Sequence, residues 1–461
     1  MSRSIVWFRR ELRLEDNAAL VAAAKESTAL LCVYVVPPRF FDMDPLGFPR
    51  VGPYRRRFLA ESLDDLRTAL AARGQRLLVR LGSPEVVLPA LAASFHCDRV
   101  FAYRLPGTEE AAEERAVEQR LSVEWSWGHT LVAPEALPMS VAALPRVFTE
   151  FRKRLEARLV VEAPLPVPPL PPAVAPEEPE GDVSALLAVA PIVDDPRAVF
   201  RFRGGARAGK DRLRHYLWES DAIARYRETR NGMHRANDSS KLSPWLADGA
   251  LSPRHVYEQL RQYEAERTKN ESTYWLFFEL LWRDFFQWVL LQHGKRLFRR
   301  GGILDKKVSW DDDDARFRAW CEGRTGVPFV DAQQRELAAT GWMSNRGRQN
   351  AAAFLAKSMR VPWTWGARWF ESLLLDFDVG SNWGNWNYTA GVGNDPRPNR
   401  WFNPVYQGEQ YDPDGAFVRT WVPELDAVPG GAVHAFFRRS REERRSLAPQ
   451  YPDPCEGAFE R

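Results

Sequence analysis

A chain of 461 residues, 45% of them hydrophobic, is too long for one hydrophobic core and too apolar for a disordered scaffold, so it predicts two or three globular domains. The 64 basic and 61 acidic residues give a net charge of +3, a near-balance that neither indicates nor excludes a nucleic-acid partner. No stretch reaches the roughly 20 apolar residues of a membrane span and none is typical of a signal peptide, so we expect a cytoplasmic protein with no membrane partner.

Short β-branched runs alternate with helical stretches in the first third of the chain. The strand candidates are residues 5–8, 29–36, 76–81, 99–103 and 122–127, and the helix candidates are 17–25 and 56–73. This alternation predicts parallel strands joined by right-handed helical crossovers, an α/β domain with a doubly wound parallel sheet over residues 1–135. Asp16 or Asn17 can cap the first helix. No GxGxxG motif follows the first strand, so a dinucleotide is expected elsewhere.

A proline-rich stretch follows this region. Eight prolines fall between residues 164 and 179, namely Pro164, Pro166, Pro168, Pro169, Pro171, Pro172, Pro176 and Pro179. Proline has a fixed φ and no amide hydrogen, so such a stretch forms neither a helix interior nor a central strand. We therefore assign residues 136–203 to an extended interdomain linker.

From residue 204 onward the pattern changes to long helices. Residues 273–293 and 346–360 are amphipathic or apolar all round, and the loops between helices are rich in glycine, asparagine and proline. The pattern predicts an all-α domain over residues 204–461. It holds 15 of the 18 tryptophans. Many of these must be core residues, but indole also stacks on flat heterocycles, which suits a flavin or a nucleobase as partner.

The four cysteines, Cys32, Cys97, Cys321 and Cys455, show neither CxxC spacing nor neighbouring histidines. This pattern argues against a zinc site and against a disulfide framework. We expect four free thiols and no bound metal.

Residues 376–397 combine carboxylates, amides, glycines and aromatics without an amphipathic period. A surface loop could have this composition, but buried, so many polar groups would need a hydrogen-bonding ligand such as a heterocycle. This stretch resembles the flavin-binding signature of the photolyase/cryptochrome family, and its residues are most similar to those of the cryptochrome-DASH branch. Residues 239–254, 278–286 and 326–349 resemble further family segments, and the likeness extends over residues 6–425. The resemblance implies that the all-α domain binds FAD.

Carried over by position, the resemblance implies which residues hold FAD. The phosphates fall to Tyr226 and to the loop of Ser239, Ser240, Lys241, Leu242 and Ser243, where hydroxyl groups and backbone amides suit an anion. Asp376 and Asp378 would hold the ribose and flavin side, with Arg348 as the salt-bridge partner of Asp376. Without a ligand, the loop would be a plain helix cap.

The resemblance also implies redox roles. Asn382 falls beside the flavin N5 atom, where an amide can donate or accept and so select the redox states that persist. Trp386, Trp363 and Trp310 fall at the family's tryptophan chain, which relays an electron from the surface to the photoexcited flavin. The alternatives are a loop asparagine and three ordinary core tryptophans.

Other family positions face DNA. Glu279 matches the acid that contacts a pyrimidine dimer, and Trp282 matches the ring that stacks on its bases after they leave the duplex, a step for which photolyases are a known example. Arg230, Asn345, Arg346 and Gln407 match further DNA contacts, although the arginines could equally belong to a solvated charged face.

Three positions limit the DNA lesions and strand forms that the resemblance implies as substrates. Gln349 and Tyr388 stand where ordinary dimer photolyases commonly have methionine and tryptophan, which places duplex repair in doubt. Ser344 stands where repair of the 6-4 photoproduct requires a histidine, and serine cannot act as that acid.

An antenna chromophore is expected in the N-terminal domain. Glu109 matches half of the polar pair that holds a folate, 5,10-methenyltetrahydrofolate, in the family, whereas Thr108 departs from the usual amide. A distal basic contact would come from Lys295 or Arg296. A different antenna, or none, is the alternative.

Two functions are compatible with these residues. The first is a light-driven lyase that splits cyclobutane pyrimidine dimers, preferentially in single-stranded DNA, by electron transfer from photoexcited reduced FAD. The second is a blue-light photoreceptor with DNA affinity and little or no repair. We expect a monomer whose partner is single-stranded or locally melted DNA. Retention of Glu279 and Trp282 favours the lyase.

Overall fold

The computed structural model describes residues 2–174, 177–397 and 400–455. Its N-terminal part is a five-stranded, all-parallel sheet with the strand order β3-β2-β1-β4-β5. The strands are β1 (Arg3–Phe8), β2 (Ala29–Val36), β3 (Leu77–Leu81), β4 (Arg99–Tyr103) and β5 (Val123–Ser126). The predicted parallel sheet is confirmed. The order reverses at β1, which is the centre of a doubly wound arrangement.

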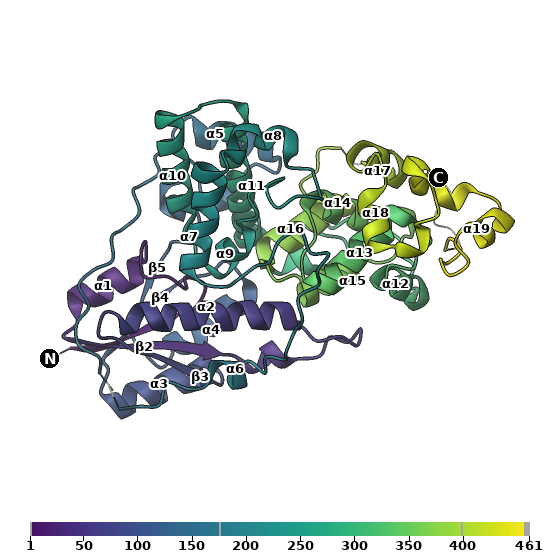
Figure 1. Cartoon of the computed structure of the whole chain (residues 1–461). Helices are drawn as coiled ribbons and strands as arrows, with labels where there is room; N and C mark the ends of the chain where they lie inside the picture. Colours follow the sequence, from purple (N-terminus) through teal and green to yellow (C-terminus); the bar gives the residue numbers. More distant parts are fainter. Residues whose placement is uncertain (1, 175–176, 398–399, 456–461) are drawn as a thin grey trace.

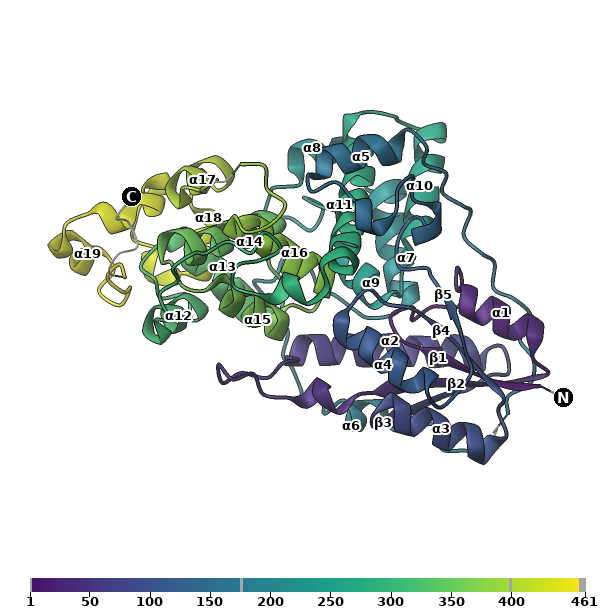
Figure 2. The same ribbon diagram turned by 180° about the vertical axis from the view of Figure 1, so that it is seen from behind.

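Helices cover both faces of this sheet (Figures 1 and 2). The helices α1 (Ala18–Glu26), α2 (Pro53–Ala71) and α6 (Val183–Leu186) pack on one face. The other face is covered by α3 (Pro84–Phe95) and α4 (Thr108–Glu118). Alternate strand residues point to opposite faces, so Val6 and Phe8 join the first core and Ile5 and Trp7 the second.

The sequence left open whether Asp16 or Asn17 caps the first helix, and in the structure the two residues have different roles. The Oδ1 atom of Asn17 caps α1, accepting from the Leu20 amide at 3.0 Å. Asp16 is fully buried and accepts from the Leu165 amide at 3.1 Å and from Arg254 Nε at 3.1 Å. One carboxylate therefore ties the first turn of the sheet domain to the proline-rich stretch and to the helical domain.

Residues 136–203 are more structured than an extended linker. They contain α5 (Phe148–Glu156), whose Phe148, Phe151 and Leu155 are buried in the core of the helical domain, as well as α6. The stripe at i, i+3 and i+7 makes α5 amphipathic, so it packs rather than remaining exposed. Within the proline-rich run, Pro172 and Val174 lie along β2: the Pro172 carbonyl accepts from the Leu30 amide at 3.0 Å, and the Val174 amide donates to the Leu30 carbonyl at 2.9 Å.

The described residues from 204 onward form helices and loops without a strand, as the predicted all-α domain requires. The first group of helices is α7 (Ala206–Arg214), α8 (Tyr226–Thr229), α9 (Ser243–Asp248), α10 (Pro253–Glu266) and α11 (Glu271–His293). The second group is α12 (Asp314–Cys321), α13 (Pro328–Thr340), α14 (Asn345–Ala353), α15 (Trp363–Leu373), α16 (Val379–Ala390), α17 (Pro404–Tyr411), α18 (Ala416–Trp421) and α19 (Arg441–Leu447). The predicted helix 346–360 is divided: α14 ends at Ala353, and a wider turn follows over Phe354–Ser358.

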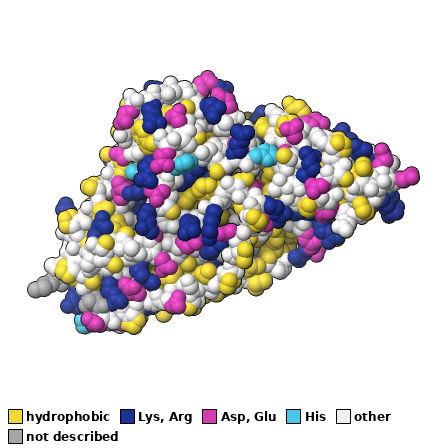
Figure 3. Space-filling view, in the orientation of Figure 1, with side chains coloured by type: hydrophobic (Ala, Val, Ile, Leu, Met, Phe, Trp, Pro, Cys, Tyr) yellow, Lys and Arg dark blue, Asp and Glu magenta, His cyan; other side chains and the backbone are white. Residues whose placement is uncertain are grey.

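Helix α11 is the axis of the helical domain and packs along α16, where the two groups of helices meet (Figure 1). Asn270 caps it in a reciprocal arrangement with Thr273. Across the described ranges, we find no helix long and apolar enough to cross a bilayer, nor a cluster of three side chains suited to a metal. Basic and acidic side chains intermingle on the face seen in Figure 3, in line with the near-balance of charge.

Candidate functional site

A cavity of about 370 Å³ opens between α9, α11, α14 and α16. It brings together residues that lie about 150 positions apart, because Tyr226 and Asp378 both line it. Among the residues that the resemblance assigns to FAD or to DNA, the following line this cavity: Tyr226, Arg230, Ser239, Ser240, Lys241, Leu242, Ser243, Glu279, Trp282, Asn345, Arg348, Asp376 and Asp378.

The loop from Ser239 to Ser243 is shaped by a residue that the sequence did not single out. The guanidinium of Arg212 donates to the carbonyl oxygens of Ser239 and Ser240, both at 2.9 Å, and to that of Ala236 at 3.0 Å. Lys241 has a φ of +54°, which turns the chain sharply at the loop's centre. Arg212 therefore fixes the backbone of a loop whose residues line the cavity.

Asp376 and Arg348 form the ion pair that the resemblance implied. One guanidinium nitrogen of Arg348 lies 3.0 and 2.9 Å from the two carboxylate oxygens of Asp376. Arg348 Nε donates to the Met343 carbonyl oxygen at 2.9 Å, and the guanidinium lies over the Trp342 ring at 5.2 Å. Asp376 is buried, so this pairing keeps its charge from being isolated.

Asp378 is the best-connected acid of the cavity. As the cap of α16, its Oδ1 atom accepts from the Ser381 amide at 2.7 Å and from Gln287 at 2.6 Å. Its Oδ2 atom lies 3.5 Å from His129 Nε2 and 3.6 Å from Arg10. Burial alone would raise the pKa of Asp378, but His129 and the charges of Arg283 and Arg10 outweigh it and hold the pKa well below its ordinary value. Asp378 is therefore anionic.

The polar groups of the cavity fit FAD. Serine hydroxyls and the Lys241 ammonium supply donors for phosphates, and carboxylates supply acceptors for hydroxyl and N–H groups. The Oδ2 atom of Asp378 is buried and makes no short hydrogen bond among the described residues, with His129 at 3.5 Å and Arg10 at 3.6 Å, so a donor from a ligand would complete its hydrogen bonding. Burial lowers the pKa of Lys241 to about 8, which an adjacent phosphate would reverse.

Asn382 and the three relay tryptophans lie outside the lining of this cavity. Asn382 is buried on α16, and its amide nitrogen donates to the Ala367 carbonyl oxygen of α15 at 3.0 Å. Trp386 packs on Phe370 at 5.1 Å and on Trp320 at 6.1 Å. Trp363 is fully buried, whereas Trp310 is half-buried.

The residues that the resemblance assigns to the lesion are packed as a unit. The ring of Trp282 is stacked on that of Phe148, with centroids 3.7 Å apart, and Tyr388 meets it edge-on at 5.9 Å. Glu279 forms an ion pair with Arg230. Burial raises the pKa of Glu279, and the Arg230 charge opposes that rise. Phe148 belongs to α5, so a helix inside the predicted linker supports the site.

The remaining two DNA candidates meet at the rim. Arg346 lies 3.4 Å from the Gln407 side-chain oxygen and donates to Gln349 at 3.0 Å and to Asn231 at 3.0 Å. Its guanidinium also lies over the Tyr411 ring at 4.7 Å. The contacts hold a half-buried cation beside the cavity, a suitable arrangement for a backbone phosphate.

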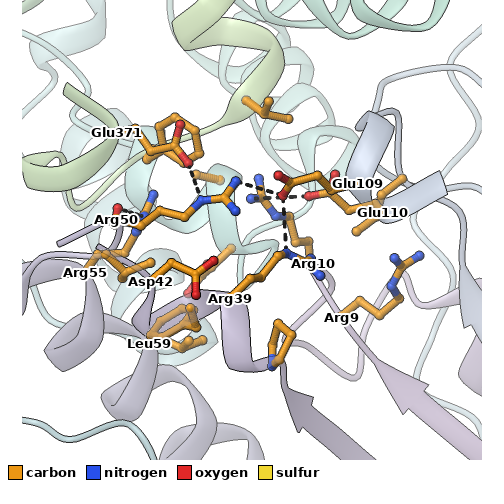
Figure 4. A pocket seen from close by; sticks show the side chains of 18 of the residues that line it. Arg9, Arg10, Arg39, Asp42, Arg50, Arg55, Leu59, Glu109, Glu110 and Glu371 are labelled. Atoms are coloured by element: carbon orange, nitrogen blue, oxygen red, sulfur yellow. Dashed lines mark hydrogen bonds and ion pairs between the residues drawn. The ribbon is translucent and has the colours of Figure 1, made fainter. Parts of the chain in front are cut away.

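A second cavity, of about 550 Å³, lies between the sheet domain and the helical domain. Figure 4 shows it crossed by ion pairs. Half-exposed Glu109 lies 2.7 Å from Arg50 and 3.3 Å from Arg39. Arg50 also lies 3.0 Å from Glu371, on α15. Glu371 was not singled out by the sequence, since only the fold places it opposite Glu109.

The two candidates for the distal basic contact of the antenna site, Lys295 and Arg296, differ in their surroundings. Gly294 lies near Thr108, because an added Cβ would be 3.9 Å from the Thr108 methyl group, an ordinary contact distance. Lys295 is therefore next to a residue that faces this cavity. Arg296 is directed elsewhere, because its guanidinium donates to the Ile303 carbonyl oxygen at 2.9 Å.

Comparison with known proteins agrees with this geometry. A family model described as the FAD binding domain of DNA photolyase matches residues 275–458, and one described as DNA photolyase matches residues 4–172. The cryptochrome DASH of Gloeobacter violaceus is 46% identical over 99% of this chain and 93% of its own length. That of Danio rerio is 46% identical over 98% of this chain and 90% of its own.

Two solved structures extend the comparison. The cryptochrome of Synechocystis sp. PCC6803 has a TM-score of 0.95 at 44% identity, covering 99% of this chain and 96% of that one. A bacterial class III photolyase from Agrobacterium tumefaciens has a TM-score of 0.85 at 30% identity, covering 98% and 94%. The chain therefore belongs to the photolyase/cryptochrome family, in its cryptochrome-DASH branch, and its helical domain is the FAD-binding domain of that family.

Proposed function

We propose that this protein binds DNA and splits cyclobutane pyrimidine dimers in blue light, with a preference for single strands. The observation that carries the proposal is a shared cavity: the acid and the ring assigned to the dimer, Glu279 and Trp282, line the same space as the residues assigned to FAD. When bound and reduced, FAD supplies on excitation the electron that opens the dimer. A dimer in this cavity would meet it at contact distance.

The chain's own residues have separate tasks. Ser239 to Ser243 and Lys241 hold the phosphates of the cofactor, and Asp376 and Asp378 orient its ribose and flavin side. Trp282, whose ring is stacked on that of Phe148 and which lines the cavity, stacks on the extruded bases. Asn382 is assigned to tuning the flavin, through a side chain fixed by its bond to Ala367.

Arg230 and Glu279 form a pair that DNA can separate. In the free protein Arg230 compensates the charge of Glu279. A backbone phosphate that recruits Arg230 leaves Glu279 buried without its cation, so the pKa of Glu279 rises further and the acid takes up a proton. Protonated Glu279 then donates a hydrogen bond to a pyrimidine carbonyl oxygen, where charge develops as the dimer opens.

Single strands are favoured for an energetic reason. Extruding a dimer from a duplex costs a few kcal/mol of stacking and pairing, which a single strand has largely lost already. The ring of Tyr388 contacts Trp282 edge-on, and the Arg400 guanidinium lies 5.0 Å from its centre. Tyr388 is therefore already in contact with protein side chains on this side of the cavity. Gln349 is likewise engaged by Arg346.

The test is repair of a thymine dimer in matched single-stranded and duplex oligonucleotides by the photoreduced protein, in blue light and in darkness. Light-dependent repair restricted to the single strand supports the proposal. Efficient duplex repair removes the strand preference. A protein that carries FAD and binds the oligonucleotides but repairs neither strand form supports the second candidate, a photoreceptor. The contacts of Trp386 with the rings of Trp320 and Phe370 favour that candidate.

The second cavity is proposed as the antenna site for 5,10-methenyltetrahydrofolate. Glu109 would bind the pterin after exchanging Arg50, and Arg39 and Arg50 would then attract the carboxylates of the folate tail. The archaeal photolyase of Sulfolobus tokodaii, at 28% identity, was solved with two FAD molecules, so a second flavin is the competing occupant. Absorbance titration with either compound, for the wild type and Glu109→Ala, decides between them.

A further inference from the structure

Trp383 connects the tryptophan at the middle of the expected relay with the second cavity. Its ring packs edge-on against Trp363, with centroids 5.8 Å apart, and against Phe298 at 4.9 Å. Trp383 is only 5% exposed, yet it lines the 550 Å³ space between the domains. Trp386 rests against α15 at Gly366, one turn beyond Trp363, where an added Cβ would lie 2.3 Å from its ring.

A carboxylate lies beside the Trp383 indole. Nε1 of Trp383 is 3.4 Å from Oε2 of Glu371, and the other oxygen of Glu371 accepts from Arg50 at 3.0 Å. Figure 4 shows Glu371 extending from α15 towards Arg50 at this cavity. Glu371 is 8% exposed, so its charge acts through a medium of low dielectric constant and stabilises a positive charge on the indole.

In the described part of the chain, neither Trp363 nor Trp310 has such a partner. Nε1 of Trp363 donates to the Arg300 carbonyl oxygen at 2.9 Å, a group that cannot accept a proton at neutral pH. Nε1 of Trp310 is buried and has no acceptor among the residues that the structure describes. Oxidised indole is strongly acidic at N–H, so a nearby carboxylate both attracts the positive charge and removes the proton.

We propose that Trp383 is an end point of light-driven electron transfer in this protein and that Glu371 accepts its indole proton. The inference rests on the FAD binding assumed in the proposed function and on the tryptophan relay, in which photoexcited oxidised flavin, not the reduced flavin that splits the dimer, is the electron acceptor. Trp386 gives an electron to the flavin, Trp363 restores Trp386, and Trp383 restores Trp363. The N–H bond of Trp383 then breaks, its proton passes to Oε2 of Glu371, and a neutral Trp383 radical remains.

The cavity supplies the route by which Trp383 is restored. A thiol that enters it gives one electron and one proton to the Trp383 radical and is itself oxidised to a thiyl radical. Glu371 releases its proton to water in the same space. Trp383 therefore competes with Trp310 as the outlet of the relay, and a ligand that fills the cavity would close this outlet.

The experiment is flash photolysis of the FAD-loaded, oxidised protein, read through the absorption of tryptophan radicals. We compare the wild type with Trp383→Phe, Trp310→Phe, the double variant and Trp320→Phe. The last is the matched control, because Trp320 also packs on Trp386 but its Nε1 donates to the Ala351 carbonyl oxygen. Trp383→Phe should lower the yield of long-lived neutral radical at least about twofold, and Trp320→Phe should not.

Glu371→Gln tests the proton step separately. It retains a side chain of the same shape, so Trp383 should still be oxidised, but the cation radical should persist about tenfold longer before it deprotonates. Near-UV circular dichroism of each apoprotein verifies that the Trp363–Trp383 packing survives, independently of flavin chemistry. If Trp383→Phe does not bind FAD, the Glu371→Gln result alone decides.

Two outcomes overturn the inference. The first is loss of the long-lived radical in Trp310→Phe with wild-type behaviour in Trp383→Phe. The second is a deprotonation rate that Glu371→Gln leaves unchanged. Dimer repair by chemically reduced wild-type protein is measured in parallel. A protein that repairs the dimer but forms no Trp383 radical contradicts this inference alone. A protein that forms the Trp383 radical but repairs no dimer contradicts the proposed function.

Discussion

Lys241 is the residue through which cofactor binding depends on pH. Burial lowers its pKa to about 8, so its ammonium is charged below that pH and neutral above it in the protein without FAD. A phosphate needs the charged form, and binding must therefore take up a proton at alkaline pH. We predict that FAD affinity falls by up to about tenfold between about pH 7 and about pH 9.

Fluorescence titration of the apoprotein with FAD measures this dependence. Lys241→Met is the control, since it removes the titrating group while keeping an unbranched side chain, and its affinity should be weaker and level over the same range. A wild-type affinity that stays level, or rises, with pH would show that Lys241 does not contact the phosphates.

Glu279 is the residue to which we assign the stabilisation of the opening dimer. Glu279→Ala should lower the yield of dimer splitting by roughly tenfold, because the opening dimer loses one stabilising hydrogen bond. Glu279→Gln keeps an N–H donor and should retain most of the yield. Equal losses in the two variants, measured as repaired dimers per absorbed photon, would refute a role for Glu279 as hydrogen-bond donor.

At the scale of elements, α5 shows what the sequence could and could not predict. The parallel strands, α11 and the all-α domain follow from hydrophobic periodicity, and the structure confirms them. The apolar stripe of Phe148, Phe151 and Leu155 could also have predicted a helix. It lies beside the proline-rich run, however, and that run led us to assign the whole segment to an extended linker. Arg212 left no such signal, because only the fold brings α7 beside the loop whose carbonyl groups it holds.

Phe148 gives a test at this scale. Phe148→Ala removes a buried ring that packs on Phe151, Phe285 and Trp282, which should lower the free energy of unfolding by about 3 to 4 kcal/mol. Phe148→Leu should cost about half as much, and both should weaken binding of a dimer-containing strand through Trp282. Urea unfolding and fluorescence anisotropy measure the two effects. Unchanged DNA binding in a folded Phe148→Ala protein would mean that Trp282 needs no support.

At the scale of the whole molecule, charged side chains join the two domains. Arg13 of the sheet domain donates to the Gly249 carbonyl oxygen at 2.7 Å, and Arg10 reaches Asp378 in the FAD site. Asp16 pairs with Arg254 where both are largely buried. Because these contacts are buried and polar, they fix one relative arrangement of the domains and with it the cavity between them.

Asp16 and Glu162 provide a matched pair of variants, since both pair with Arg254. Asp16→Ala leaves a buried guanidinium without its main partner and should cost about 3 to 5 kcal/mol of unfolding free energy. Glu162 is 83% exposed, and Glu162→Ala should have little effect. Comparable losses in urea unfolding would contradict the importance assigned to burial at this interface.

The central claim is that FAD and the dimer occupy one cavity, and flavin fluorescence tests it most directly. A dimer within contact distance accepts an electron from the excited, reduced flavin and so quenches its emission. We predict quenching by a single-stranded oligonucleotide that contains a dimer, little quenching by the same undamaged strand, and loss of the difference in Trp282→Ala. Equal emission with both strands, while anisotropy shows both bound, would contradict the shared cavity.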